Sequence, residues 1–167
     1  MDEIETHCKA GRLFLVEPLR KEFRAERERT IYALPNIYEF LHSDRWLAPQ
    51  TEADFSDFIR GKDIYVALEL DHQDCFMARL EKAAEEVWEI RIWEPGVPQL
   101  RFFGRFAHQD VFVVLLGPMK RWKLLWRDYK WIKRECISEW QRLFGLRPPV
   151  MKGDNIHAYI SKNVNLV

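Results

Sequence analysis

Basic side chains gather in the second half of this chain, at positions that could bind phosphate. Seven of them lie between Lys120 and Arg134, where Asp128 is the only acid. Three more stand in the two strand-like segments before that stretch: Arg91, Arg101 and Arg105. Guanidinium and ammonium groups bind phosphate oxygens, and closely spaced groups of this kind bind polyanions. A polyanion is therefore the first partner that these residues indicate.

One reaction suited to such a group is the cleavage of RNA by its own 2′-hydroxyl. It needs positive charge at the non-bridging phosphate oxygens, a general base and a general acid. Two strands of one sheet, with the basic stretch that follows them, could supply the charge. The candidate catalytic residues are Arg91, Arg101, Arg105, Lys120 and Arg121. The alternative is that the three arginines lie on the solvated face of a half-buried sheet and pair there with Glu89 and Glu94.

No residue stands out as the acid or the base. His108, in a predicted turn, and His157, in the C-terminal tail, could titrate near neutral pH, but a lone histidine in a loop is commonly a polar surface residue. His72 and Cys75 have the spacing of a metal-binding pair, yet no second pair completes a tetrahedral site. The sequence contains no Walker, GxGxxG, HExxH or GxSxG motif. We therefore expect neither a metal nor a cofactor.

The composition narrows the class of protein. With 167 residues, of which 47% are hydrophobic, the chain can bury one core, and we expect a single domain over residues 1–167. The 26 basic and 26 acidic residues cancel. Most small nucleic-acid-binding domains are basic overall, so affinity for RNA must come from a local patch. Three widely spaced cysteines and the lack of a long apolar run favour the reducing cytoplasm over secretion or a membrane.

The candidate residues need strands to carry them. Residues 87–93 and 100–106 alternate between two sets of side chains, one of them largely charged, which is typical of strands with one covered face. Residues 111–116 are apolar on both faces, which predicts a buried central strand. Turn residues separate the three segments. We therefore expect an α+β fold in which a small antiparallel sheet, a meander, packs against helices.

Helices are predicted on both sides of these strands in the sequence. Apolar residues recur every three or four positions from 122 to 144, which indicates a long amphipathic helix that covers the sheet and ends at Gly145. Trp131 lies off the apolar stripe and is expected to be exposed. Two shorter helices are predicted between residues 36 and 61. The predicted parts of the domain are an N-terminal extension (1–50), a core with the long helix (51–145) and a tail (146–167).

The order of these segments, together with their residues, resembles the RelE/HigB-like toxins of the RelE/ParE superfamily. The resemblance spans residues 77 to about 134 and rests on Ala78-Arg79-Leu80, Val87-Trp88-Glu89-Ile90-Arg91, a turn, Leu100-Arg101-Phe102-Phe103, an apolar strand and a basic helix start. It implies a small cytoplasmic, metal-independent ribonuclease that cleaves messenger RNA in the ribosomal A site, or a relative without nuclease activity. It also implies that Arg91, Arg101 and Lys120 or Arg121 hold the scissile phosphate, and that an antitoxin-like protein partner neutralises the toxin.

A second hypothesis is a catalytically inactive protein–protein interaction module on the same fold. Glu89 stands where the best-known ribosome-dependent nucleases have Lys, although Glu also occurs there in the HigB-like branch, and the net charge is zero. Salt distinguishes the two hypotheses, because binding through several phosphates weakens steeply with added salt, whereas binding through an aromatic protein interface does not.

Overall fold

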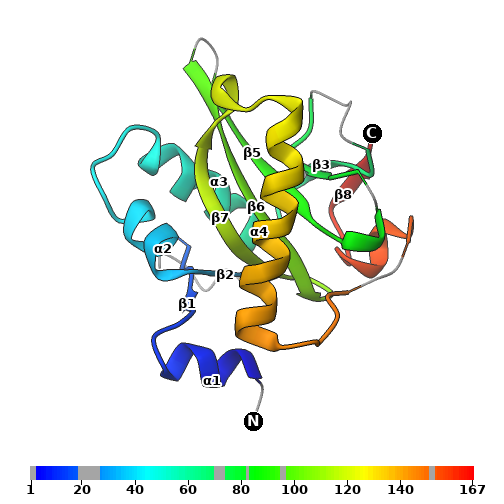
Figure 1. Ribbon diagram of the computed structural model, residues 1–167. Helices are drawn as coiled ribbons and strands as arrows, with labels where there is room; N and C mark the ends of the chain where they lie inside the picture. Colours follow the sequence, from blue (N-terminus) through cyan, green and yellow to red (C-terminus); the bar gives the residue numbers. More distant parts are fainter. Residues whose placement is uncertain (1–2, 19–26, 70–73, 82, 95–96, 151–152) are drawn as a thin grey trace.

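Eight strands among the described residues form one sheet with helices on both faces (Figure 1). The computed structural model describes residues 3–18, 27–69, 74–81, 83–94, 97–150 and 153–167. The strands are β1 (Phe14–Leu15), β2 (Thr30–Ala33), β3 (Ile64–Ala67), β4 (Met77–Arg79), β5 (Trp88–Glu94), β6 (Val97–His108), β7 (Val111–Lys120) and β8 (Val164–Leu166), in the spatial order β1-β2-β7-β6-β5-β4-β3-β8. The helices are α1 (Glu3–Lys9), α2 (Pro35–Leu41), α3 (Ala48–Ile59) and α4 (Trp126–Phe144), with 3-10 turns η1 (Ala83–Glu85), η2 (Arg121–Lys123) and η3 (Ile156–Ala158).

The fold is α/β with a mixed sheet of eight described strands, so the predicted α+β fold with a small antiparallel meander is wrong. β5, β6 and β7 pair antiparallel, but β2 joins β7 in parallel on one side, and β3 pairs in parallel with both β4 and β8 on the other. The strands β2, β3, β4 and β8 have only three or four residues each. Runs that short show no clear alternation of apolar and polar residues, so no local pattern predicts them as strands. The parallel partners of β2 and β8 are also distant in sequence.

Neighbouring residues of β6 contact helices on opposite faces of the sheet. The Phe102 ring packs against phenylalanines of α2 and α3, with centroids 5.9 and 5.4 Å away. The next ring, Phe103, lies 6.1 Å from that of Tyr129 in α4. Successive side chains of a strand point to opposite faces, so the two predicted arginines of β6 lie on the α4 side with Phe103. Arg91 of β5 stands opposite one of them and shares that side.

The long helix begins later than the sequence predicts. β7 continues through Pro118 to Lys120, and η2 follows, so that α4 starts only at Trp126. The Asp128 carboxylate accepts a hydrogen bond from the backbone N–H of Leu125 at 2.6 Å and caps the helix. The basic stretch of the sequence is therefore divided between the end of a strand, a 3-10 turn and a helix.

The inner side of α4 packs on the sheet. Its apolar stripe is buried at Ile132, Cys136 and Trp140, whereas Trp131 is 46% exposed, as predicted. The helix ends before Gly145, as the sequence predicts, where a φ of 58° suits a glycine. The predicted burial of Trp122 and Trp126 concerns side chains outside the described part of the chain.

None of the helices in the described residues is long and apolar enough to cross a membrane.

A buried arginine joins the start of β2 to two other segments. Arg29 is 2% exposed. Its guanidinium donates hydrogen bonds to the backbone carbonyls of Lys62 at 3.1 Å, Lys162 at 2.7 Å and Asn163 at 2.9 Å. It also lies 5.1 Å from the centroid of the Phe58 ring. Residues 30–33, which belong to the predicted extension, form β2 and pair with β7 in the sheet.

Candidate functional site

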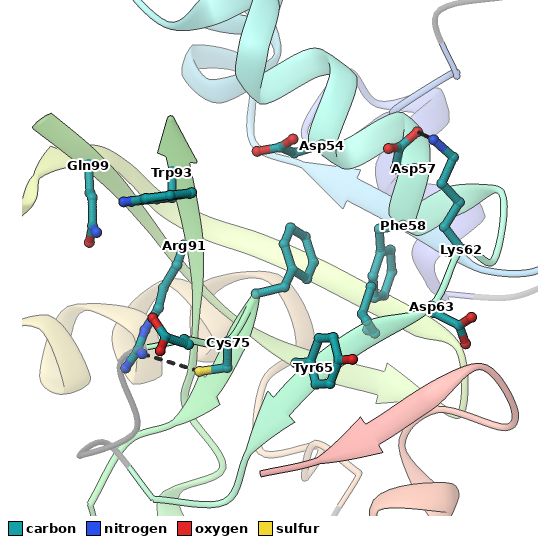
Figure 2. A pocket seen from close by; sticks show the side chains of 13 residues that line it. Asp54, Asp57, Phe58, Lys62, Asp63, Tyr65, Cys75, Arg91, Trp93 and Gln99 are labelled. Carbon is teal, nitrogen blue, oxygen red and sulfur yellow. Dashed lines mark hydrogen bonds and ion pairs between the residues drawn. The ribbon is translucent and has the colours of Figure 1, made fainter. Parts of the chain in front are cut away.

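Arg91 leaves β5 on the α4 side, and only 7% of its side chain is exposed. Its Nε donates a hydrogen bond to Glu89 Oε1 at 2.6 Å. Its Nη1 donates to the Cys75 sulfur at 3.2 Å (Figure 2). Burial raises the pKa of the Cys75 thiol, and the charge of Arg91 opposes that shift. A carboxylate and a protonated thiol, rather than solvent, therefore hold the guanidinium of Arg91.

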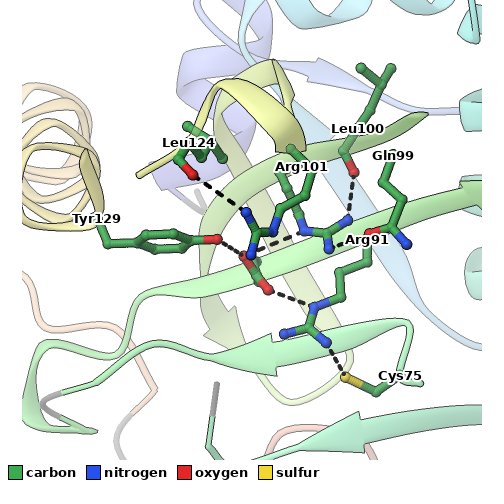
Figure 3. A network of polar contacts seen from close by, with 9 residues as sticks. Cys75, Arg91, Gln99, Leu100, Arg101, Leu124 and Tyr129 are labelled. Atoms are coloured by element: carbon green, nitrogen blue, oxygen red, sulfur yellow. Dashed lines mark hydrogen bonds and ion pairs between the residues drawn. The ribbon is translucent and has the colours of Figure 1, made fainter. Parts of the chain in front are cut away.

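Glu89 is the centre of the cluster, and 1% of it is exposed. Its Oε2 accepts a hydrogen bond from the Tyr129 hydroxyl at 3.3 Å. The Nε of Arg101 lies 3.7 Å from the same oxygen, and Figure 3 shows Arg91, Arg101 and Tyr129 converging there from two strands and a helix. We call these four residues the Glu89 cluster. Two guanidinium groups share one carboxylate, which leaves one positive charge in excess.

Arg101 also forms two hydrogen bonds within its own strand. Its Nη2 donates to Gln99 Oε1 at 2.6 Å, and its Nη1 donates to the backbone carbonyl of Leu100 at 3.2 Å. Burial lowers the pKa of the Arg101 guanidinium, and the Glu89 carboxylate opposes that shift. Arginine nevertheless keeps its proton in proteins. The excess positive charge is therefore a permanent property of the cluster.

Tyr129 is the member of the cluster that sequence reasoning missed. Burial raises its pKa to about 12, and the Glu89 carboxylate adds to that shift. The phenol is therefore protonated at neutral pH and can donate its proton. In the sequence Tyr129 belongs to the apolar stripe of a helix, which indicates packing rather than chemistry. Its position in that stripe does predict contact with the sheet, and the sheet residue that it meets is a carboxylate.

Arg105 and Lys120 lie apart from the Glu89 cluster. The guanidinium of Arg105 donates a hydrogen bond to the backbone carbonyl of Glu85 and lies 5.6 Å from the Trp140 ring. Burial lowers its pKa. The ammonium group of Lys120 lies 5.3 Å from the Trp46 ring. Arg105 therefore packs between η1 and α4, and the structure does not bring it together with the other two strand arginines.

The sheet face that carries the three arginines is covered, so the alternative in which they lie on a solvated face is wrong. Arg91, Arg101 and Arg105 are 7%, 4% and 6% exposed. Charged side chains in alternate positions usually mark an exposed face of an antiparallel sheet, and strand periodicity cannot show that α4 lies over this one. The expected ion pair between a strand arginine and Glu89 does form. The side chain of Glu94, the other expected partner, lies outside the described residues.

A basic surface follows η2 and the outer side of α4. We give this name to six exposed residues: Lys120, Arg121, Lys123, Arg127, Lys130 and Arg134. Lys133, the remaining cation of the stretch, is buried. Its ammonium group contacts the backbone carbonyl of Glu81 at 3.1 Å and the Glu85 carboxylate at 3.0 Å. All but one of the cations that the sequence singles out between 120 and 134 thus face solvent.

The helical part of the basic surface forms one face of α4. Arg127, Lys130 and Arg134 recur at spacings of three and four residues, so their side chains are neighbours on the helix. The exposed Trp131 lies among them. Within the described part of the chain, none of these three cations forms an ion pair with a carboxylate. Their charge is therefore available to a partner.

The basic surface borders the Glu89 cluster at Arg121. This exposed arginine is close enough to act electrostatically on both Arg101 and Tyr129. Arg121 is the first residue of η2, which follows β7, the strand next to β6. Of the predicted site residues, the structure therefore groups Arg91, Arg101 and Arg121.

The predicted histidines do not join this group. His108 Nε2 lies 2.8 Å from a terminal nitrogen of Arg147, and His157 is exposed in η3. His72 lies outside the described residues. In the described part of the chain, no three His, Cys, Asp or Glu side chains come together in a way that could hold a metal ion. Glu89 and Tyr129 are therefore the groups of the cluster that can exchange a proton.

The chain matches no protein-family model, no curated protein and no solved structure.

The site has an outer part, the basic surface, and an inner part, the Glu89 cluster. Chemically, the outer part can bind phosphate groups. The inner part can neutralise charge on a phosphate through two guanidinium groups and can exchange a proton through a carboxylate and a phenol.

Proposed function

We propose that this protein binds RNA through its basic surface. The observation that carries the proposal is the row of exposed cations on η2 and α4, which on the helix are not paired with any described carboxylate. Such a row binds successive phosphates, and an exposed indole such as Trp131 can stack on a base. A local surface of this kind provides affinity for RNA in a chain whose net charge is zero.

The Glu89 cluster is the proposed centre for cleavage of the bound strand. In that reaction the 2′-oxygen bonds to phosphorus, the bond to the 5′-oxygen breaks, and a 2′,3′-cyclic phosphate remains. Glu89 accepts the proton of the 2′-hydroxyl, and Tyr129 gives its proton to the leaving 5′-oxygen. Arg91 and Arg101 neutralise the charge on the phosphate. Since Glu89 is 1% exposed, this proposal requires η2 and the first turn of α4 to move off the sheet when RNA binds.

The resemblance to RelE/HigB-like toxins supports the same proposal and extends it. By that resemblance the RNA is messenger RNA on the ribosome, and an antitoxin-like protein neutralises the activity.

We also propose a cytoplasmic location. All three cysteines, Cys8, Cys75 and Cys136, are described, and none forms a disulfide, which suits a reducing compartment.

A second candidate function is a protein interaction module that uses the same surface. It is favoured by two large apolar side chains within the basic stretch, since Leu125 is 54% and Trp131 46% exposed. Exposed apolar and aromatic residues rimmed by polar ones are common at protein interfaces. The two functions differ in their dependence on salt.

The binding proposal is tested with a labelled single-stranded RNA at several salt concentrations. We expect the affinity of the wild type to fall steeply with salt. The double variant Arg127→Glu/Lys130→Glu should bind at least about tenfold more weakly and should lower the slope of log K against log salt by roughly 1.4, as expected for the loss of two contacts to a single strand. Arg12→Glu changes an exposed arginine outside the basic surface and should behave as the wild type. A flat salt response would reject RNA and favour the interaction module.

The rate at which the same labelled RNA is cleaved tests the second step. The variant for this test is Tyr129→Phe, which keeps the ring and removes the hydroxyl. If Tyr129 donates the proton, this variant should cleave at least about 100-fold more slowly while it binds RNA as the wild type does. Tyr65→Phe, in an exposed tyrosine of β3, is the matched control. Failure of folded wild-type protein to cleave RNA, alone or with ribosomes, would reject the cleavage step and leave the binding proposal in place.

A further inference from the structure

A pocket of about 420 Å³ opens between the C-terminal half of α3, β3 and the sheet residues next to it (Figure 2). It borders the Glu89 cluster at Arg91, and Gln99, which accepts a hydrogen bond from Arg101, also lines it. Its opposite wall is α3. Its volume falls in the range of small-molecule sites, about 300–1,000 Å³. The aromatic rings and the charged groups that line the pocket indicate which small molecules it can bind.

Aromatic rings form much of the wall. Phe58 of α3 and Phe76 are stacked, with centroids 5.8 Å apart and planes at 28°. Tyr65 and Trp93 line the same pocket and are 54% and 57% exposed. Large rings that stay this exposed around a concave surface are typical of a binding site rather than of an ordinary surface.

The charged groups of the pocket are mainly acidic. Its two cations are both paired: Lys62 lies 2.7 Å from Asp57, which also lines the pocket, and Arg91 lies 2.6 Å from Glu89. Four carboxylates line the pocket: Asp54, Asp57, Asp63 and Asp74. An anion such as an RNA phosphate would be repelled here, in contrast to the basic surface on η2 and α4.

We propose that this pocket binds an organic cation, an ammonium or guanidinium group carried on a short apolar stem. The exposed rings of Tyr65 and Trp93 hold the stem and attract the cation through their faces, as aromatic cages do. The aspartates balance its charge and exclude neutral and anionic molecules of the same shape. The concave aromatic wall makes this a binding site, and the carboxylates select the charge of its ligand. The proposal does not depend on RNA binding.

The test compares two molecules that differ in charge but hardly in shape, n-butylguanidinium and n-butylurea. Calorimetric titration of the full-length protein, without RNA, should show saturable binding of the guanidinium compound and none of the urea. A capped Gly-Arg-Gly peptide identifies the source of the cation. Tighter binding of the peptide would assign the pocket to an arginine side chain of a partner, and tighter binding of n-butylguanidinium to a free metabolite.

Variants locate the binding in this pocket. Asp54→Asn/Asp74→Asn removes two carboxylates with little change of shape and should weaken n-butylguanidinium binding about tenfold. Glu52→Gln lies on the same helix but does not line the pocket, and it should bind as the wild type does. Equal binding of n-butylurea, no saturable binding of the cation below about 10 mM, or equal behaviour of the two variants would overturn the proposal.

Discussion

The strand pattern around Glu89 does not show the environment that this residue has in the structure. In the sequence it alternates with apolar neighbours, and in one of the two interpretations it faces solvent with Arg91. In the structure it is 1% exposed and is bonded by Arg91 and Tyr129. A buried carboxylate requires cations or hydrogen-bond donors around it, because its transfer from water is costly. The three groups that meet it come from positions up to 40 residues away, so no local pattern could assemble the cluster.

Tyr129 is expected to make the stability of the fold depend on pH at high pH. Its pKa is raised from the ordinary value of 10.0 to about 12, first by burial and then by Glu89. The unfolded chain therefore loses this proton before the folded protein does. The contribution to stability is complete below a pH of about 10 and is lost as the pH rises toward about 12.

Chemical denaturation over this pH range measures the effect. The free energy of unfolding should fall less steeply in Tyr129→Phe than in the wild type, because the variant has no phenol to titrate at that position. Tyr65→Phe removes an exposed phenol and should keep a decline closer to that of the wild type. Equal slopes in the wild type and Tyr129→Phe would contradict the raised pKa.

At the scale of elements, the close approach of β6 and β7 depends on Gly104. A Cβ atom at this position would overlap the carbonyl oxygen of Val113 and contact the Phe112 ring. We therefore expect Gly104→Ala to lower the free energy of unfolding by about 2 kcal/mol or more, since one strand must shift. Urea denaturation measures the loss.

A second glycine provides the comparison. A Cβ at Gly153 meets nothing within 4 Å, and its φ of 57° is the only obstacle to a side chain. Gly153→Ala should therefore cost about 1 kcal/mol, for the left-handed backbone alone. Similar losses in the two variants would show that the contact with β7 is not the cause at Gly104.

Elements were predictable where the chain has a long regular pattern. β5, β6 and β7 overlap the three predicted strands, and α4 ends where Gly145 predicts. The predicted start of α4 was wrong, because the apolar spacing begins at residue 122, whereas β7 and η2 extend to Lys123. A Gly-Pro pair such as Gly117-Pro118 usually marks a turn. Here Pro118 stays within β7, at a place where the β6–β7 register shifts between Arg101 and Phe103. A bulge of this kind tolerates proline, because the ladder is already interrupted there.

At the scale of the whole molecule, Arg29 connects segments from both ends of the chain. Its guanidinium holds backbone carbonyls before β3 and before β8. Arg29→Met fills part of the volume but removes three hydrogen bonds to these part-buried carbonyls. We expect it to lower the free energy of unfolding by about 3 kcal/mol. Hydrogen exchange should also become faster in β8, which pairs only with β3 in the described sheet.

Denaturation and hydrogen exchange of the same samples measure both effects. Arg12→Met, in an exposed arginine, is the control and should change stability by less than about 0.5 kcal/mol. A small loss in Arg29→Met together with unchanged exchange in β8 would mean that strand pairing alone holds the C-terminal segment.

The sequence by itself determined the three central strands, the long amphipathic helix with its end, the exposure of Trp131 and the basic stretch between Lys120 and Arg134. Each of these follows from periodicity or charge within a few neighbouring residues. Only the tertiary structure decided that the sheet is mixed, that α4 buries the strand arginines, and that Glu89 and Tyr129 join two of them. The physical reason is that pairing of short strands and burial of charge depend on groups far apart in the chain, whose contacts exist only once the helix lies on the sheet.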